Sequence, residues 1–149
     1  MATGASTVDS AVIFIDARKG VLAQSKRNSY ICYLFGIKYI LVTINKMDLV
    51  NYKELRFREI IEDYSQFASS IGIEDPSFIP LSGIHGDNIV SVSENMKWYK
   101  GGPLLKLLED MDLDDSSILS QPFRMPVQFV NRPNSDFRGV SGKTASGCI

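Results

Sequence analysis

The chain has 149 residues, about the length of one domain, and its content of 44% hydrophobic and 22% charged residues is ordinary for a globular protein. Its formal net charge of −1 provides no global positive field, so neither nucleic acid nor an anionic membrane is expected as a partner. No apolar run approaches the roughly 18 residues of a membrane span, and the start lacks the basic region of a signal peptide.

The first predicted strand is the continuous apolar run 11–15, which ends at Asp16. Such a run predicts a strand that is buried on both faces, as in a parallel sheet. A helix is expected over about residues 22–35, because Gly36 directly after it is typical of a helix C-terminus. The apolar positions of that segment include Tyr30, Ile31 and Leu34.

Two cysteines, Cys32 and Cys148, lie far apart and match no metal-binding or redox spacing. Cys32 falls within an apolar helical pattern, so we expect it to be a small core residue. A reduced, cytoplasmic location is consistent with this use of cysteine.

The second predicted strand is the run 39–44, which is rich in β-branched residues. The helix after it has the clearest pattern in the chain, because its apolar residues repeat at steps of three and one along a single face. Gly72 is expected to end this helix. The apolar face consists of Phe57, Ile60, Ile61, Tyr64, Phe67, Ala68 and Ile71.

A third short strand is predicted at 78–81, and a last helix is expected to have Pro103 in its first turn. The apolar side of that helix would be Leu104, Leu105, Leu107, Leu108 and Met111. Strands that alternate with helices predict an α/β fold, with a parallel sheet and right-handed crossover helices.

The pattern changes near residue 112, where an acidic segment of small residues predicts a linker at 112–121. A strand is expected over 123–130, and the tail that follows is rich in glycine and serine. We therefore predict an α/β domain at 1–111 and the first strands of a truncated β-domain at 122–149.

The residues after the second strand, Asn45, Lys46, Met47 and Asp48, form an Asn-Lys-x-Asp pattern at a strand end, where α/β sheets bind ligands. Guanine presents two adjacent donors, N1–H and an exocyclic amine, and one carboxylate can accept both. Asp48 would therefore select the base, while the Asn45 amide bridges the base edge to backbone and the stem of Lys46 lies on the purine ring. The alternative is a strand-end turn of solvated polar residues.

The residues after the third strand, Ser82, Gly83 and Ile84, form a second candidate loop. Gly83 permits close approach of the backbone, where an N–H could bond guanine O6. In G domains the Asn-Lys-x-Asp strand is followed by a helix and then by a strand that ends in a Ser-Ala or Ser-Gly loop. The same order is found here, which favours guanine recognition.

The phosphate-binding motif of a G domain, Gly-x4-Gly-Lys-Ser/Thr, is not found in these residues. The segment 142–144 has the sequence Gly-Lys-Thr, but the position five residues before Gly142 is Phe137, and no helical pattern follows. We interpret it as a loop. The near-match leaves open a circularly permuted GTPase, in which the phosphate loop follows the base-recognition loops.

Five segments together resemble the GTP-binding large subunits of bacterial sulfate adenylyltransferases, which belong to the elongation-factor-like translational GTPases. The resemblance follows the chain in order and covers nearly all of it. The last of these segments separates it from elongation factors Tu and 1-alpha. The segments are MATGASTVDSAVIFIDARKGV, INKMDLV, FIPLSGIHGDNIV, SENMKWYKGGPLL and PVQFVNRPNSDFRG.

The resemblance implies a fold and a function. Residues 1–111 would be the C-terminal part of a P-loop-NTPase-like G domain, followed by the opening strands of a β-barrel domain. The family hydrolyses GTP to drive formation of adenylyl sulfate from ATP and sulfate. Adenylyl transfer takes place on a separate small catalytic subunit, and some large subunits are fused to an adenylyl-sulfate kinase.

The resemblance assigns guanine recognition to two sets of residues, 45–48 and 82–84. It places the phosphate loop, the Mg²⁺-binding threonine and an Asp-x-Pro-Gly-His segment upstream of Met1, so the chain would be a fragment that is inactive alone. Two alternatives belong to other classes: an elongation-factor-type translation GTPase that binds tRNA, and a non-enzymatic α/β interaction module.

Overall fold

The computed structural model describes residues 8–37, 39–111 and 120–148, and the chain divides into two compact units, 1–111 and 112–149. Most of the predicted linker at 112–121 lies outside the described residues. The first unit contains a sheet with helices, and the second contains a small antiparallel sheet. None of the helices in the described ranges has the length and apolar character needed to cross a membrane.

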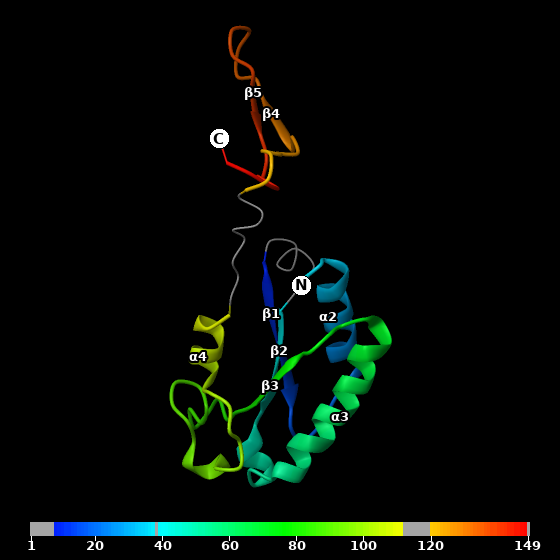
Figure 1. Cartoon of the computed structure of the whole chain (residues 1–149), viewed down its shortest axis with the longest axis vertical. Helices are drawn as coiled ribbons and strands as arrows, with labels where there is room; N and C mark the ends of the chain where they lie inside the picture. The colour runs from blue at the N-terminus through cyan, green and yellow to red at the C-terminus, as the bar shows by residue number, and fades with distance from the viewer. Residues whose placement is uncertain (1–7, 38, 112–119, 149) are drawn as a thin grey trace. The chain divides into compact units, whose positions relative to one another are not determined.

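The sheet of the first unit is parallel, with the strand order β1-β2-β3 (Figure 1). Its register places Asp16 opposite Asn45 and Ile44 opposite Pro80, so the three strands end at the same edge. That edge is where ligands bind in α/β sheets. The strands are β1 (Ser10–Asp16), β2 (Tyr39–Asn45) and β3 (Ser77–Pro80).

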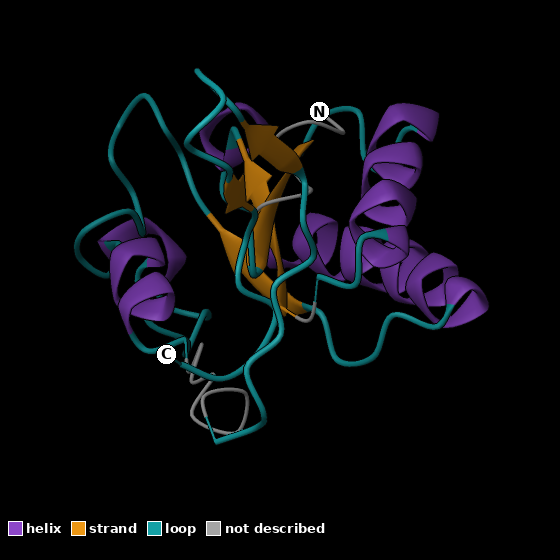
Figure 2. Cartoon of the chain, turned by 90° about the horizontal axis from the view of Figure 1, so that it is seen from above, coloured by secondary structure: helices purple, strands orange, loops and turns teal. Residues whose placement is uncertain are grey.

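Helices cover both faces of this sheet, with α2 and α3 on one side and α4 on the other (Figures 1 and 2). The larger core lies under α2 and α3, and a smaller cluster of Leu41, Ile79 and Leu81 lies under α4. Two short 3-10 helices, Met47–Val50 and Glu94–Met96, occur in the connections. The α-helices are α2 (Ala23–Leu34), α3 (Glu54–Ile71) and α4 (Leu104–Glu109).

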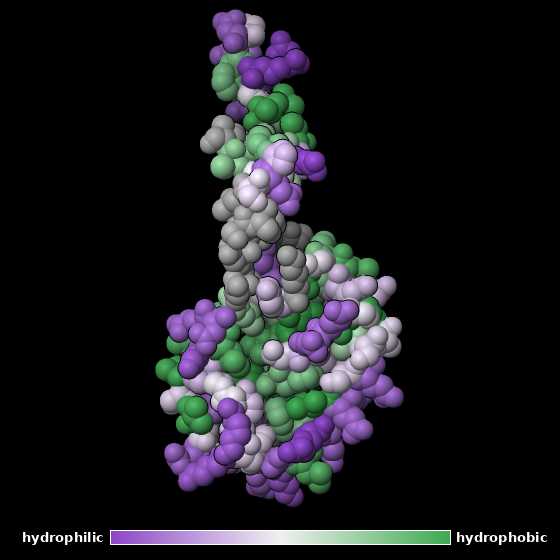
Figure 3. All heavy atoms as spheres, viewed as in Figure 1, coloured by the Kyte–Doolittle hydropathy of each residue, from purple (hydrophilic) through white to green (hydrophobic). Residues whose placement is uncertain are grey.

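Helix α3 has the amphipathic face that its sequence predicts, with hydrophilic residues over its outer side (Figure 3). It ends at Gly72, whose φ of +83° suits a residue without a Cβ. The hydroxyl of the fully buried Tyr64 donates to Ser29 Oγ of α2 at 2.8 Å, which connects the two helices. The buried face consists of Phe57, Ile60, Tyr64 and Ala68.

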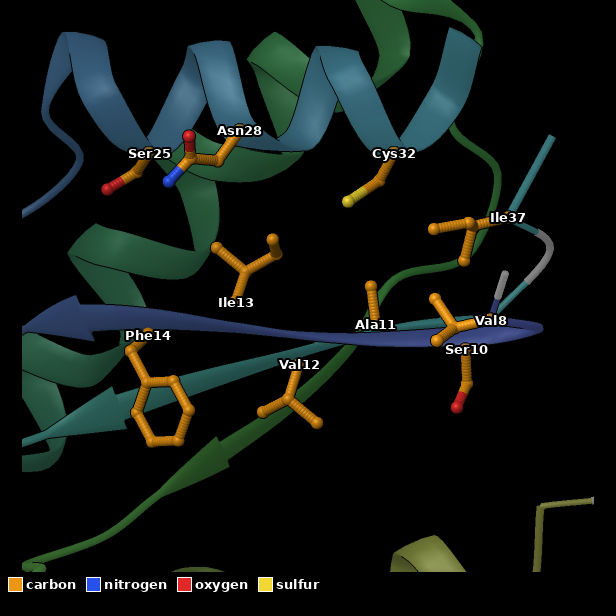
Figure 4. A pocket seen from close by; sticks show the side chains of 10 residues that line it. All are labelled: Val8, Ser10, Ala11, Val12, Ile13, Phe14, Ser25, Asn28, Cys32 and Ile37. Atoms are coloured by element: carbon orange, nitrogen blue, oxygen red, sulfur yellow. The ribbon is translucent and has the colours of Figure 1, made fainter. Parts of the chain in front are cut away.

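Strand β1 differs from the prediction, because it is not buried on both faces. Ala11 and Ile13 point toward α2, while Val12 and Phe14 point the opposite way (Figure 4). Phe14 is 60% exposed, whereas Val12 packs against the cluster under α4. The prediction fails because α4 covers β2 and β3, whereas β1 forms the end of the described sheet.

The predicted apolar positions of α2 are only partly buried. Ile31 packs against the core, but Tyr30 and Leu34 are exposed, and the fully buried residues are Ser29 and Cys32. Cys32 is therefore a core residue, as predicted. A helix with two small buried residues gives little amphipathic signal in sequence.

Helix α4 also buries fewer residues than its sequence predicts. Leu104, Leu107 and Met111 pack against the sheet, while Leu105 and Leu108 are exposed. Pro103 precedes the helix as its N-cap residue instead of lying in its first turn.

The second unit contains two short antiparallel strands, and the strand predicted at 123–130 is mostly wrong. Only its last two residues lie in a strand, because Pro126 has no N–H to donate to a ladder. Arg124 instead forms an isolated bridge with Ser146. The sequence pattern did not predict the second strand. The strands are β4 (Phe129–Asn131) and β5 (Gly139–Ser141).

Candidate functional site

The first predicted loop begins at the last residue of β2 and continues into the 3-10 helix Met47–Val50. The side chain of Met47 is fully buried in the core, and its N–H donates to the carbonyl of Leu81 at 3.2 Å. Lys46 has a φ of +65°, an uncommon conformation for a residue with a Cβ. Met47 is therefore the anchor of the loop, while Asn45, Lys46 and Asp48 remain partly exposed.

The second predicted loop follows β3 and folds back on itself. Ser82 is fully buried, and its N–H donates to the carbonyl of Asp87 at 3.2 Å. The buried side chain of Asn88 donates to the carbonyl of Pro80 at 2.9 Å, which closes the base of the loop. Ile84 at the tip is 81% exposed.

The two loops are joined by hydrogen bonds between predicted site residues. The hydroxyl of Ser82 donates to Asp48 Oδ1 at 2.6 Å. Asn45 Oδ1 accepts from the N–H of Gly83 at 3.0 Å and from the N–H of Lys46 at 2.6 Å. The structure thus brings together side chains that lie more than 30 residues apart in sequence.

A Cβ added to Gly83 would lie 3.5 Å from the side-chain amide of Asn45, an ordinary contact distance. The fold of this loop therefore does not itself require glycine at position 83. Alanine would also fit there, which agrees with a loop that tolerates Ser-Ala or Ser-Gly.

Sequence reasoning missed Asp16 as part of the site. Lys46 Nζ lies 3.0 Å from Asp16 Oδ2, and the Arg18 side chain donates to both oxygens of Asp16. The hydrogen bond from Arg18, together with that from Lys46, holds the pKa of Asp16 well below its ordinary value although burial acts in the opposite direction. The available signal was its place at the end of β1, next to Asn45 on β2.

Tyr52 and Asp87 were also missed, and their side chains meet at the ends of the two loops. The Tyr52 hydroxyl donates to Asp87 Oδ2 at 2.9 Å. Burial and this contact raise the pKa of Tyr52 to about 12. Burial also acts to raise the pKa of Asp87, but hydrogen bonds from Ser93, Tyr52 and Asn95 outweigh it and leave that pKa below its ordinary value.

The segment Gly142–Thr144 lies beyond β5, and no helix follows it among residues 145–148. A Cβ on Gly142 would collide with the carbonyl oxygen of Pro126, so glycine is needed there for backbone packing. The segment thus lacks the loop-to-helix geometry of a phosphate-binding loop. The described residues also contain no group of three or more His, Cys, Asp or Glu that could hold a metal ion.

Residues 1–113 match the family model described as the elongation factor Tu GTP binding domain. Over its full length the chain is 52% identical to sulfate adenylyltransferase subunit 1 of Psychromonas ingrahamii, 55% to that of Aliivibrio salmonicida and 54% to that of Salmonella typhi. It spans about 31% of the length of each of these relatives.

Among solved structures, Sup35 complexed with GMPPNP is 28% identical, with a TM-score of 0.67 over 97% of this chain and 38% of that one. The selenocysteine-specific elongation factor EF-Sec is 20% identical, with a TM-score of 0.59 over 98% of this chain and 23% of that one, which shows likeness of fold alone. These likenesses confirm the predicted α/β fold of the G-domain type.

Proposed function

This chain belongs to the family of elongation factor Tu GTP binding domains, and from that membership we propose that its two loops bind the guanine base of GTP. The observation that carries the proposal is the pair of contacts between the loops, Ser82 to Asp48 and Gly83 to Asn45. These contacts hold a carboxylate and a carboxamide at the carboxyl-end edge of the sheet, where a ligand of an α/β fold is expected.

Asp48 provides the selectivity in this proposal. Its carboxylate accepts from N1–H and from the exocyclic amine of guanine, a donor pair that adenine does not have. Hydrogen bonds to a charged group contribute about 1.5–3 kcal/mol each. The bond from Ser82 fixes the rotamer of Asp48 before the base arrives, which lowers the entropic cost of recognition.

Asn45 has a divided role. Its Oδ1 is already engaged by two backbone N–H groups, so its Nδ2 is the group left to donate to an acceptor on the base. The Gly83 N–H already donates to Asn45 Oδ1, so it is not available to the base. Ile84 is 81% exposed and its N–H makes no hydrogen bond to the described residues, so we propose this N–H as the donor for guanine O6.

Lys46 contributes through its stem and its charge. The ion pair with Asp16 fixes the ammonium group, and the aliphatic stem can then lie along the face of the purine. Met47 has no direct contact in this scheme, since its side chain lies in the core.

The relatives at 52–55% identity, which are named sulfate adenylyltransferase subunit 1, support a proposal for the activity of the whole protein. We infer that the protein hydrolyses GTP in the cytoplasm and couples hydrolysis to the formation of adenylyl sulfate from ATP and sulfate. A small catalytic subunit would perform the adenylyl transfer, and a fused adenylyl-sulfate kinase is compatible with this scheme. The described residues contain no group of three or more His, Cys, Asp or Glu that could hold a metal ion, and this proposal gives none of the loop residues a role in binding Mg²⁺ or the triphosphate.

The test uses the complete gene product that carries this sequence, mixed with the small subunit of a related enzyme. GTP hydrolysis should require ATP and sulfate and should proceed with release of pyrophosphate. Sulfate-independent hydrolysis together with tight binding of aminoacyl-tRNA would contradict this function and would favour the translation GTPase.

A further inference from the structure

A second contact joins the two loops, and it lies outside the base-recognition residues. Tyr52 follows the first loop and Asp87 ends the second, and their side chains meet in a hydrogen bond of 2.9 Å. These residues are 35 positions apart in sequence. The bond is therefore a tertiary tie between the loops, which we call the Tyr52–Asp87 clasp.

Each member of the clasp is also bonded through its backbone to a loop residue. The Tyr52 N–H donates to the carbonyl of Met47 at 2.8 Å, and the Asp87 carbonyl accepts from the N–H of Ser82 at 3.2 Å. Because Ser82 also donates to Asp48, these contacts close a ring that includes both loops. The clasp is therefore one of the contacts that connect Asp48 to the second loop.

The backbone of the clasp is held in an unfavourable conformation. Asn51 and Tyr52 have φ values of +53° and +52°, in the left-handed region that side chains with a Cβ disfavour. Such conformations persist where surrounding contacts determine them, and they concentrate at functional sites. One of these contacts is the indole N–H of Trp98, which donates to the Tyr52 carbonyl at 3.0 Å.

The two groups of the clasp keep their protonation states near neutral pH. Burial and the contact with Asp87 raise the pKa of Tyr52 to about 12, so its hydroxyl keeps the proton that it donates. Ser93 Oγ at 2.5 Å and Asn95 Nδ2 at 3.3 Å donate to Asp87 Oδ1 and leave Oδ2 for Tyr52. The Tyr52 hydroxyl thus stays a donor and the Asp87 carboxylate stays a charged acceptor.

We propose that Tyr52 and Asp87 are positioning residues for guanine specificity, which hold Asp48 where its carboxylate meets N1–H and the exocyclic amine together. This inference rests on the proposed function of the loops. It predicts that the clasp affects discrimination between bases in addition to stability.

The experiment measures the affinities of the complete gene product for GDP and for IDP, which lacks the exocyclic amine. In Tyr52→Phe the preference for GDP over IDP should fall about tenfold, equivalent to about 1.4 kcal/mol. Tyr99→Phe is the matched control, because it also removes a tyrosine hydroxyl that donates a hydrogen bond, here to the carbonyl of Phe78 in β3 and not to a residue of either loop. The control should leave the preference unchanged even where thermal unfolding shows a similar loss of stability.

A second pair of variants tests the same bond from the other side. Asp87→Ala removes the acceptor and should reproduce Tyr52→Phe, whereas Asp87→Asn keeps an acceptor and should retain most of the preference. If Tyr52→Phe does not fold, this pair of variants still tests whether the Tyr52–Asp87 bond affects the preference for GDP over IDP.

The outcomes separate this inference from the function on which it rests. A wild-type preference that persists in Tyr52→Phe and in Asp87→Ala overturns the clasp alone. A wild-type protein that does not prefer GDP overturns guanine recognition and the clasp together.

Discussion

Replacement of Asp48 by asparagine tests guanine recognition at the residue that carries it. The amide oxygen of asparagine can still accept from the Ser82 hydroxyl, which now donates to Asp48 Oδ1 at 2.6 Å, so the loop should stay folded. Its amide group, however, would face a donor of guanine instead of accepting from it. Loss of one charge-assisted bond and weakening of the other amount to about 3 kcal/mol, or a factor of about 100 to 200 in Kd.

Xanthine carries a carbonyl where guanine carries the exocyclic amine, so Asp48→Asn should improve binding of XDP while it weakens binding of GDP. Isothermal titration calorimetry of the complete gene product with both nucleotides measures the change. Asp63→Asn is a matched control, because Asp63 lies on the exposed side of α3, where it forms an ion pair with Lys26 of α2. An unchanged ratio of GDP to XDP affinity in Asp48→Asn would refute the assignment of Asp48.

The remaining predictions concern charge, thiol reactivity and catalysis. Because Arg18 and Lys46 hold the folded-state pKa of Asp16 below its unfolded value of about 4, their contacts stabilise the fold above that pH and are lost on acidification toward the folded-state pKa. Asp16→Asn should therefore lower the free energy of unfolding in urea at pH 7. The difference in this free energy between wild type and variant should be smaller at pH 3, and an equal difference at both pH values would contradict this account. Cys148 is exposed, whereas Cys32 is buried and burial raises its pKa. A thiol reagent should therefore modify Cys148 rapidly and Cys32 slowly, and Cys32→Ala should remove the slow phase of the reaction. The 149 residues alone should show no Mg²⁺-dependent GTP hydrolysis in a phosphate-release assay. Clear turnover would mean that they contain residues that bind the triphosphate.

The elements that sequence predicted well are those whose pattern is local. The spacing from Phe57 to Ala68 defines the buried face of α3, and Gly72 marks its end because the left-handed conformation there favours glycine. The loop at 45–48 was visible because its polar residues follow an apolar strand directly. The structure then brought this loop to the one at 82–84, as the parallel order of strands implies.

The parts that sequence could not predict depend on tertiary neighbours. The exposure of Phe14 follows from where α4 packs, and nothing in the run 11–15 records that position. The roles of Asp16 and of Asp87 depend on partners 30 or more residues away in sequence, so a single polar residue at a strand end or in a loop gave no signal. In the second unit, Pro126 interrupts a run that otherwise has strand composition.

Strand β1 has a practical consequence for work with this polypeptide. It is bonded to β2 on one side only, its other edge is unpaired within the described sheet, and Phe14 presents an aromatic ring to water. Unpaired edges with apolar side chains promote strand addition between copies, a common origin of aggregation. Strand β1 is therefore a place where copies of the isolated polypeptide can associate, and a charged residue at position 14 is expected to raise the concentration at which it stays dispersed.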